Sequence, residues 1–455
     1  MRVPLRFALP FLGLLATIHL TAIVAASTNL PLMDEWEMLA PGGLDRTLNW
    51  RWVFAAHNEH RIVFTKLITW VLYKANGWHH VANLVFNFFL YILTIAAFLF
   101  LLRTIKQSSA GLQKKGIGFD EIGWATLALS GLAWENHSWG FQNQFHLFLL
   151  FFFLGSAFAI RGPDKLQIWL AASLAICSAW SFSSGVVCAL AIAALIAWRG
   201  IVGSLAWRKI TPQLILILAA ITLWVAGFQK NPGHPAYSWP TGNHFWGHFL
   251  TMLGSGWGLK SVLKVPVAAV VLGLVLFQLS LVAMSLIKSN KSNSRKQHQQ
   301  WLGAILFTCS GLIATAALTS LARGQFGREQ AESSRYTEFT FFLLPLAWTI
   351  FTSGPKEGFR SHINTRQAWI IKAIIGLLLV WSFAPYYDYR KVYQWHSDQM
   401  AAGRKCVATF YAQNTAATAS CSTLYLAPIE AQLLRARELN LAFTAEYGIN
   451  QGVTP

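Results

Sequence analysis

The sequence predicts an all-α protein that crosses a membrane many times. Of its 455 residues, 55% are hydrophobic and 12% are charged, whereas about 25% of a soluble domain is charged. Apolar stretches recur along most of the chain, and they have the length of helices that cross a bilayer core of about 30 Å. They do not form alternating segments of about ten residues, which argues against an outer-membrane β-barrel.

Hydrophobic segments place about eleven membrane-spanning helices in the chain. The first is preceded by Arg2 and Arg6 and ends in "AAS", and so it is also similar to a cleavable secretory signal. Its apolar run is longer than a usual signal core, so we expect a retained helix. Residues 166–198 are predicted as two short helices, and the alternative for this segment is a single long bent helix. The predicted spans are 5–27, 80–102, 120–137, 144–160, 166–182, 184–198, 212–228, 262–287, 301–321, 338–352 and 368–384.

Positive residues predict which helix ends face the cytoplasm. With the N-terminus inside, every inner loop carries Lys or Arg, whereas the outer turns "SWGFQNQ" and "SFSSG" carry neither. The net charge of +18 then reflects cytoplasmic loops rather than nucleic-acid binding. We expect a multi-pass protein of the bacterial inner (plasma) membrane, with the endoplasmic reticulum as the alternative. Residues 1–385 form its membrane domain, with outer loops 28–79, 229–261 and 322–337, and residues 386–455 form a small extracytoplasmic C-terminal segment.

Chemically reactive side chains concentrate on the predicted outer face. The positive-inside rule does not sort acidic residues or histidines strongly, so topology alone does not produce this bias. Polar groups near the surface of a helical bundle usually line a water-filled cavity, and we expect one here. Only four of the 18 acidic residues and two of the 13 histidines are clearly inside, namely Asp120, Glu121, Asp164, Glu357, His298 and His362.

The first outer loop contains the candidate catalytic acids, Asp34 and Glu35 of "MDEWEML". The loop is long enough for two amphipathic helices that lie in the membrane interface. A carboxylate at this level can accept a proton from an attacking hydroxyl, and adjacent carboxylates raise one another's pKa toward neutrality. The alternative is a solvated acidic turn.

The segment "HNEHR" lies near the corner between these two helices and has three interpretations. On a helix, His57 and His60 would share a face and would bind a divalent metal together with a carboxylate. Without a metal, Arg61 and the imidazoles can donate hydrogen bonds to a phosphate. The third interpretation is helix capping at the interface. A divalent metal is the only cofactor that this segment suggests, and Glu59 between the two histidines is a further candidate for substrate binding.

Other outer segments add further candidates. Arg328, Arg335 and Tyr336 of "GREQAESSRY" can bind a lipid phosphate or pyrophosphate, or anchor the chain to lipid head groups. Glu135 and His137 of "WENHSWG" and His244 of the Pro- and Trp-rich loop can bind a polar ligand or form hydrogen bonds at helix ends. In an oxidising compartment, Cys406 and Cys421 can form a disulfide worth about 3 kcal/mol by the chain-entropy estimate.

The arrangement resembles the integral-membrane GT-C glycosyltransferases. These have many helices, a large first outer loop and an acidic motif shortly after the first helix, which Asp34 and Glu35 match by type and position. The loop from His234 to His248 and the late Arg335 are also similar to features of the family. The resemblance covers residues 1–385 and implies a polyprenyl-phosphate sugar donor, a cell-envelope glycan, lipid or protein acceptor, and Asp34 as the general base.

Three other functional classes are alternatives. A transporter or flippase of lipid-linked saccharides would carry charged groups near mid-membrane and often internal repeats, for which His19 and Asn87 are the only weak candidates. An acyltransferase would take its donor from the cytoplasmic side, where acids and histidines are few. The third alternative is a non-catalytic envelope assembly protein. The sequence lacks the nucleotide-binding motifs GxxxxGK[ST] and GxGxxG, and nucleotides are in general absent from the outer face. A sugar donor would therefore arrive there bound to lipid.

Overall fold

The computed structural model of this protein describes residues 2–110, 116–161, 165–259, 262–353 apart from 271, 274, 275, 277–279 and 281–291, then 365–413 and 421–448. Almost all regular structure in these residues is helical. The strands found there, β1 (Arg2–Val3) and β2 (Ile117–Gly118), form one short antiparallel pair. The fold is therefore all-α, as predicted.

Six helices within the described residues are long and apolar enough to cross a membrane. Exposed apolar side chains cover much of α1 and α10, among them Leu14, which is 59% exposed, and Leu223, which is 67% exposed. Apolar surface of this extent is stable against lipid rather than water, which fits the predicted membrane protein. The six helices are α1 (Leu5–Ala26), α4 (His80–Ala110), α7 (Asn143–Arg161), α9 (Ser183–Ile201), α10 (Trp207–Ala226) and α13 (Ser292–Arg323).

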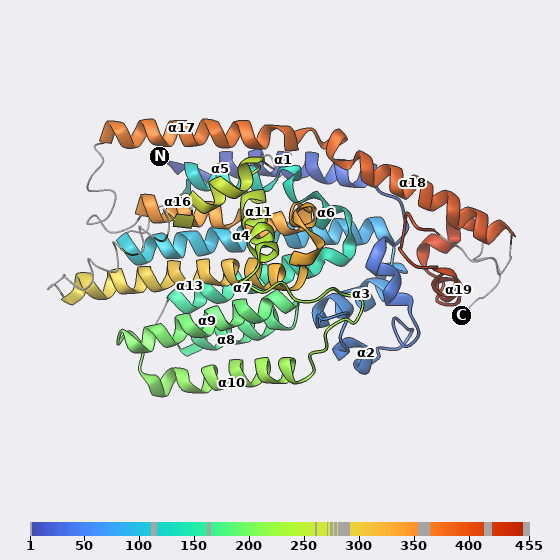
Figure 1. The fold of residues 1–455 in the computed structure, drawn as a ribbon, viewed down its shortest axis with the longest axis horizontal. Helices are drawn as coiled ribbons and strands as arrows, with labels where there is room; N and C mark the ends of the chain where they lie inside the picture. The colour runs from blue at the N-terminus through green and yellow to red at the C-terminus, as the bar shows by residue number, and fades with distance from the viewer. Residues whose placement is uncertain are drawn as a thin grey trace.

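The long helices lie along the long axis of the molecule (Figure 1). The N-terminus and the turn between α9 and α10 lie at one end, and α2 (Trp50–Phe54) and α3 (Val63–Asn76) lie at the other (Figure 1). At the N-terminal end, Arg103 near the end of α4 forms an ion pair with Glu121 of α5 (Phe119–Ala128). The first loop thus lies at the end of the bundle opposite the N-terminus.

The centre of the bundle is formed by α4, α7, α8 (Lys165–Ala179), α9 and α13. Phe148, Phe152 and Phe153 of α7 are fully buried there. A Cβ atom on Gly311 of α13 would lie 2.6 Å from the Phe152 side chain, so the glycine permits α13 to approach α7 closely. This packing fixes the ends of α9 and α13 relative to α7.

The predicted count of about eleven spans is not met, because the described residues contain six helices that can span. Residues 120–137 are not one helix: α5 ends at Ala128 and is followed by η2 (Gly131–Ala133) and α6 (Trp134–Ser138). The chain breaks here because the Ser130 side chain accepts a hydrogen bond from the Leu132 N–H and caps η2. Residues 338–352 are likewise divided, between α15 (Ser334–Phe341) and α16 (Leu343–Ser353).

Four further predicted spans have other outcomes. Residues 166–198 form two helices, α8 and α9, rather than one bent helix, and α8 has only 15 residues. The span 368–384 coincides with α17 (Thr365–Phe383), but several of its side chains lie outside the described residues. Half of the span 262–287 also lies outside them.

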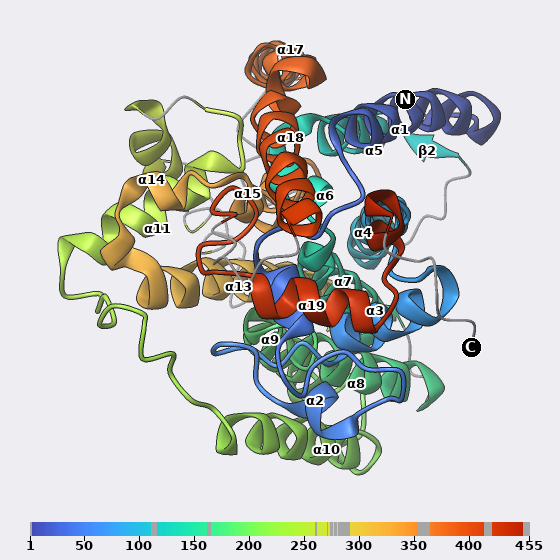
Figure 2. The same cartoon turned by 90° about the vertical axis from the view of Figure 1, so that its right-hand side faces the viewer.

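The C-terminal segment returns to the first loop. Its long helix α18 packs along α1, where the His19 Nε2 atom lies 2.5 Å from the Tyr393 hydroxyl oxygen. Helix α19 (Glu430–Glu438) lies against η1 (Met33–Leu39) of the first loop. Figure 2 shows α19 near α3. The Met33 N–H donates to the Leu424 carbonyl over 2.6 Å. The shorter helices are η1 (Met33–Leu39), η3 (Gly140–Gln142), α11 (Asn243–Ser255), η4 (Gly324–Phe326), α14 (Arg328–Ala331), η6 (Ala384–Tyr387), α19 (Glu430–Glu438) and η7 (Ala442–Tyr447), and α18 spans Tyr389–Gln413.

Candidate functional site

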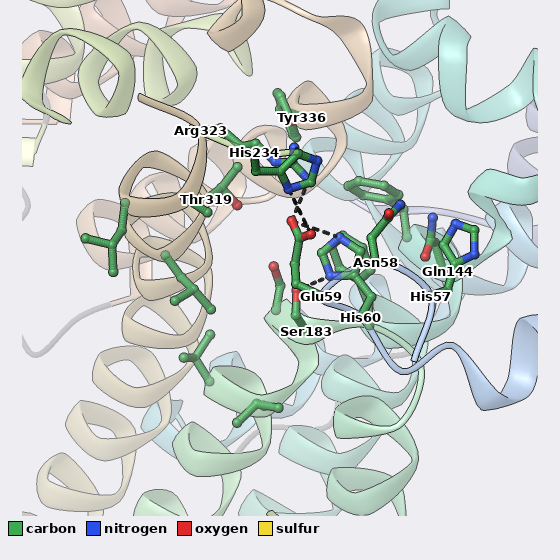
Figure 3. Close-up of a pocket in the computed structure, with 18 of the residues that line it drawn as sticks. His57, Asn58, Glu59, His60, Gln144, Ser183, His234, Thr319, Arg323 and Tyr336 are labelled. Atoms are coloured by element: carbon green, nitrogen blue, oxygen red, sulfur yellow. Dashed lines mark hydrogen bonds and ion pairs between the residues drawn. The ribbon is translucent and has the colours of Figure 1, made fainter. Parts of the chain in front are cut away.

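A cavity of about 580 Å³ lies where the first loop meets the ends of the long helices. The start of α9, the ends of α10 and α13, the start of α15 and the loop after α10 all line it (Figure 3). Part of its wall is apolar and includes Val186, Val187, Trp224 and Leu318. Its charged and titratable side chains are Asp34, His57, Glu59, His60, Lys230, His234, Tyr237, Arg323, Arg335 and Tyr336.

The "HNEH" segment forms a tight turn, so the prediction that its two histidines share one face of a helix is wrong. His57 and His60 exchange backbone hydrogen bonds of 2.8 and 2.9 Å, and Asn58 between them adopts a φ of 51°. A φ in this region is tolerated by asparagine better than by most residues. Each imidazole has its own partner: the His60 Nδ1 atom lies 2.7 Å from the Ser183 hydroxyl, and the His57 Nδ1 atom lies 3.3 Å from Glu37. Within the described part of the chain, no three His, Cys, Asp or Glu side chains are grouped to hold a metal ion.

Glu59 joins three distant segments in the polar part of the cavity (Figure 3). Its Oε1 atom accepts a 2.5 Å hydrogen bond from Arg323, and its Oε2 atom lies 3.0 Å from the His234 Nδ1 atom. Arg323 also lies 2.9 Å from the His234 Nε2 atom. Burial and the neighbouring Arg323 lower the pKa of His234, although Glu59 acts in the opposite direction. Glu59 therefore already has cationic and imidazole partners and is a scaffold for the cavity wall.

Asp34 is the predicted catalytic acid that lines the cavity. It lies in η1, and its carboxylate has no hydrogen bond or ion pair with any of the described residues. Burial, followed by the nearby Glu37, raises the pKa of Asp34 to about 6, although Arg335 and Arg323 act in the opposite direction. A carboxylate in this state is largely ionised at neutral pH and is a stronger base than an exposed aspartate.

Glu35 points away from this cavity. Its Oε2 atom accepts a 2.9 Å hydrogen bond from the Leu32 N–H and lies 3.3 Å from the His80 Nδ1 atom, and its side chain is 3% exposed. The Leu32 contact closes the start of η1 as the carboxylate of a capping box does. The two adjacent acids therefore have different surroundings, and only Asp34 faces the cavity.

Arg335 and Tyr336 begin α15 and line the same cavity. The Arg335 guanidinium lies 5.3 Å from the centre of the Tyr336 ring. Its Nε atom is buried and has no hydrogen-bond partner within the described ranges, and no carboxylate among those residues forms an ion pair with it. Lys230 is the second cation of the cavity without an ion pair to a described carboxylate; its Nζ atom lies over the Tyr237 ring.

Five other predicted residues lie outside the lining of this cavity. Arg61 donates to the carbonyls of Phe54 and Gly227 and so ties the first loop to the end of α10. The Glu135 carboxylate accepts hydrogen bonds from Ser333 and Ser334 and from the backbone N–H of Arg335, and holds the start of α15. The remaining three are His137, which is fully buried beside Tyr91 and His146, and the exposed residues His244 and Arg328.

The C-terminal segment contains one disulfide that the sequence predicted and contributes one contact that it did not suggest. A disulfide joins Cys406 of α18 to Cys421. Four residues later, the Tyr425 hydroxyl donates to the Glu37 Oε1 atom over 2.7 Å. The segment therefore reaches η1 directly beside Asp34.

Comparison of the chain with protein-family models, with curated proteins and with solved structures gave no match. The function must therefore be inferred from the chemistry of the cavity.

Proposed function

We propose that this protein is a membrane glycosyltransferase. It moves a sugar from a polyprenyl-phosphate donor to a hydroxyl group of a cell-envelope glycan, lipid or protein, at the extracytoplasmic face of a bacterial inner membrane. The observation that supports this proposal best is that one cavity holds the unpaired Asp34 carboxylate and the Arg335 guanidinium, which forms no ion pair with a described carboxylate and whose Nε atom has no described partner, beside an apolar wall.

Asp34 is assigned the role of general base. Its carboxylate takes the proton of the acceptor hydroxyl, and the oxygen forms a bond to the anomeric carbon from the face opposite the phosphate. The bond from that carbon to the phosphate oxygen breaks, and its electron pair leaves with the phosphate. A pKa raised to about 6 favours this role.

Arg335 and Lys230 are assigned to the donor phosphate. Charge grows on the phosphate oxygen as the glycosidic bond breaks, and cations already in place stabilise this charge without reorganisation. Arg323 is a weaker candidate because Glu59 already accepts a hydrogen bond from it.

The apolar wall supports a lipid-linked donor. Val186 and Val187 of α9, Trp224 of α10 and Leu318 of α13 come from three helices that can span a membrane. A ligand with a polar head and an apolar chain can place its phosphate near Arg335 and its chain along these side chains. Lipid-linked sugars have this form.

Proton-coupled transport of a lipid-linked saccharide is the second candidate. It is favoured by a buried pair beside the cavity, in which the His146 Nδ1 atom lies 2.8 Å from the Glu338 Oε1 atom and both side chains are fully buried. Ionisable groups inside membrane bundles often mark proton or ion pathways. This candidate does not require the unpaired Asp34 carboxylate to act as a base.

Mass spectrometry of envelope glycans tests the proposal in cells that carry wild-type protein, Asp34→Asn, or no copy. We expect the deletion and Asp34→Asn to lose the same sugar at equal membrane expression. Asp45→Asn is the matched control, because this acid lies in the same loop, is 51% exposed and pairs with Arg435. If Asp34→Asn retains the sugar that the deletion loses, the assignment of Asp34 as the general base is wrong. If the glycans are unchanged in the deletion, the proposed glycosyltransferase function is wrong.

A further inference from the structure

One hydrogen bond and one ion-pair contact link three side chains in a series that ends at the cavity. The Tyr425 hydroxyl donates to the Glu37 Oε1 atom over 2.7 Å, and the Glu37 Oε2 atom lies 3.3 Å from the His57 Nδ1 atom. His57 is 7% exposed and lines the cavity (Figure 3). Its second ring nitrogen, Nε2, is buried and has no partner among the residues that the structure describes.

The partners of His57 determine which ring nitrogen carries the proton. An ionised carboxylate is negatively charged and only accepts hydrogen bonds, so the Glu37 oxygen 3.3 Å away favours a proton on the His57 Nδ1 atom. Burial, followed by the Lys66 charge, lowers the pKa of His57 to about 4, so the ring is neutral at physiological pH. The Nε2 atom then has a lone pair and no proton. The charged or titratable groups that face this ring are Glu37 of η1 at 3.3 Å, Lys66 of α3, whose charge lowers its pKa, and His60 of the same turn, whose own pKa His57 lowers.

A lone pair binds a hydroxyl and repels a phosphate oxygen. The polarity of His57 is therefore opposite to the phosphate-binding role that the sequence suggested. The described residues offer two kinds of subsite in one cavity: cations without carboxylate partners, Arg335 and Lys230, and a buried hydrogen-bond acceptor, His57.

We propose that the His57 Nε2 atom binds a hydroxyl group of the sugar acceptor, in a subsite that the C-terminal segment completes through Tyr425. This inference rests on the proposed glycosyltransferase function and assigns the acceptor to the η1 side of the cavity. His57 contacts the substrate, whereas Glu37 and Tyr425 are positioning residues that set its tautomer and orientation.

The fold holds Tyr425 in place by two independent contacts. The Cys406–Cys421 disulfide fixes the start of its segment to α18. The neighbouring Leu424 is fully buried, and its carbonyl accepts the 2.6 Å hydrogen bond from Met33. Because Met33 precedes Asp34, the same segment supports both the proposed base and the proposed acceptor subsite.

Binding of soluble probes tests the subsite without knowledge of the natural substrates. Saturation-transfer NMR on the full chain in lipid nanodiscs measures affinity for a panel of methyl glycosides of common hexoses, and isothermal titration calorimetry measures affinity for inorganic phosphate. We expect His57→Gln, Glu37→Gln and Tyr425→Phe each to weaken binding of the preferred glycoside about tenfold, the effect of losing one hydrogen bond, and to leave phosphate binding unchanged. Arg335→Gln should have the reverse effect. Tyr447→Phe is the matched control, because the Tyr447 hydroxyl has no described partner.

Solid-state ¹⁵N NMR of histidine-labelled protein measures the tautomer directly, with His57→Gln used to assign the signal. We expect an unprotonated Nε2 in the wild type, and a protonated Nε2 in Glu37→Gln, whose amide can donate to Nδ1. A purely structural role for Glu37 would not move this proton. A protonated Nε2 in the wild type, no glycoside binding, or glycoside affinity unchanged in all three variants would overturn the subsite. If phosphate binding is unchanged in every variant, including Arg335→Gln, the result contradicts the proposed donor site and not the acceptor subsite.

Discussion

Arg323 and Glu59 lie 264 residues apart in the chain, and their side chains form a 2.5 Å hydrogen-bonded ion pair. The pair is mostly buried, with exposed fractions of 17% for Arg323 and 11% for Glu59. It joins the end of α13 to the turn between α2 and α3, and both residues line the cavity. The shape of the cavity therefore depends on a charged contact rather than on apolar packing alone.

Removal of one partner of this pair should destabilise the protein. We expect Arg323→Gln to lower the free energy of unfolding by about 1–3 kcal/mol, because it leaves the Glu59 carboxylate buried with one donor fewer. Thermal unfolding in detergent measures the effect. Arg435→Gln, which breaks an exposed pair with Asp45, is the control and should change stability by less than about 1 kcal/mol. Equal shifts in the two variants would contradict the prediction.

Asp34→Asn should stabilise the protein at neutral pH while it abolishes sugar transfer. The pKa of Asp34 is raised to about 6 from an ordinary value of 3.8, so the folded state binds a proton more tightly than the unfolded state. The stability of the wild type therefore falls as the pH rises from about 4 to about 6, and the asparagine variant lacks this loss. The difference at pH 7 should be on the order of 1 kcal/mol after solvent screening. If Asp34→Asn is less stable than the wild type at pH 7, this prediction is wrong.

The rate of transfer should depend on the ionisation of the same carboxylate. Because the base must be ionised, we expect the single-turnover rate to fall about tenfold per pH unit below about 6 and to level off above it. Asp34→Glu is the informative comparison, since it keeps the carboxylate and should shift the inflection. A rate that does not change between pH 5 and 8 would rule out Asp34 as the base.

Loss of the disulfide should loosen the C-terminal segment. The bond closes a loop with a sequence separation of 15 residues, for which the chain-entropy estimate is about 3 kcal/mol. We expect the double variant Cys406→Ser, Cys421→Ser to be cleaved faster by protease after residue 400 and to bind methyl glycosides more weakly. Cys177→Ser, which removes a free thiol, should behave like the wild type. Identical cleavage rates for both variants would show that the bond does not hold this segment.

The sequence predicted the helical membrane fold and the importance of the first loop, because apolar length and charge bias are local properties of the chain. The number of spans was not predictable by the same means. Residues 120–137 are apolar enough for one helix, but Ser130 caps a new turn within them, and Glu135 to His137 take part in tertiary contacts instead of continuing α5.

The composition of the candidate site was only partly visible in the sequence. Asp34 and Glu35 are equivalent as letters, yet the η1 backbone directs one carboxylate to the cavity and the other to the Leu32 N–H. His234 and Arg323 could not be assigned to Glu59 from sequence, because the contact depends on the packing of α13 and the loop after α10. The helical interpretation of "HNEH" failed because Asn58 accepts a positive φ and permits a tight turn.

The contact between Tyr425 and Glu37 spans 388 residues, and this has a consequence for biosynthesis. The ribosome produces η1 before the C-terminal segment, so the hydrogen-bond partners of Met33 and Glu37 are synthesised long after η1 itself. During most of elongation, the acidic segment lacks these partners. The wall of the cavity beside Asp34 is therefore completed only after the C-terminal segment has been synthesised.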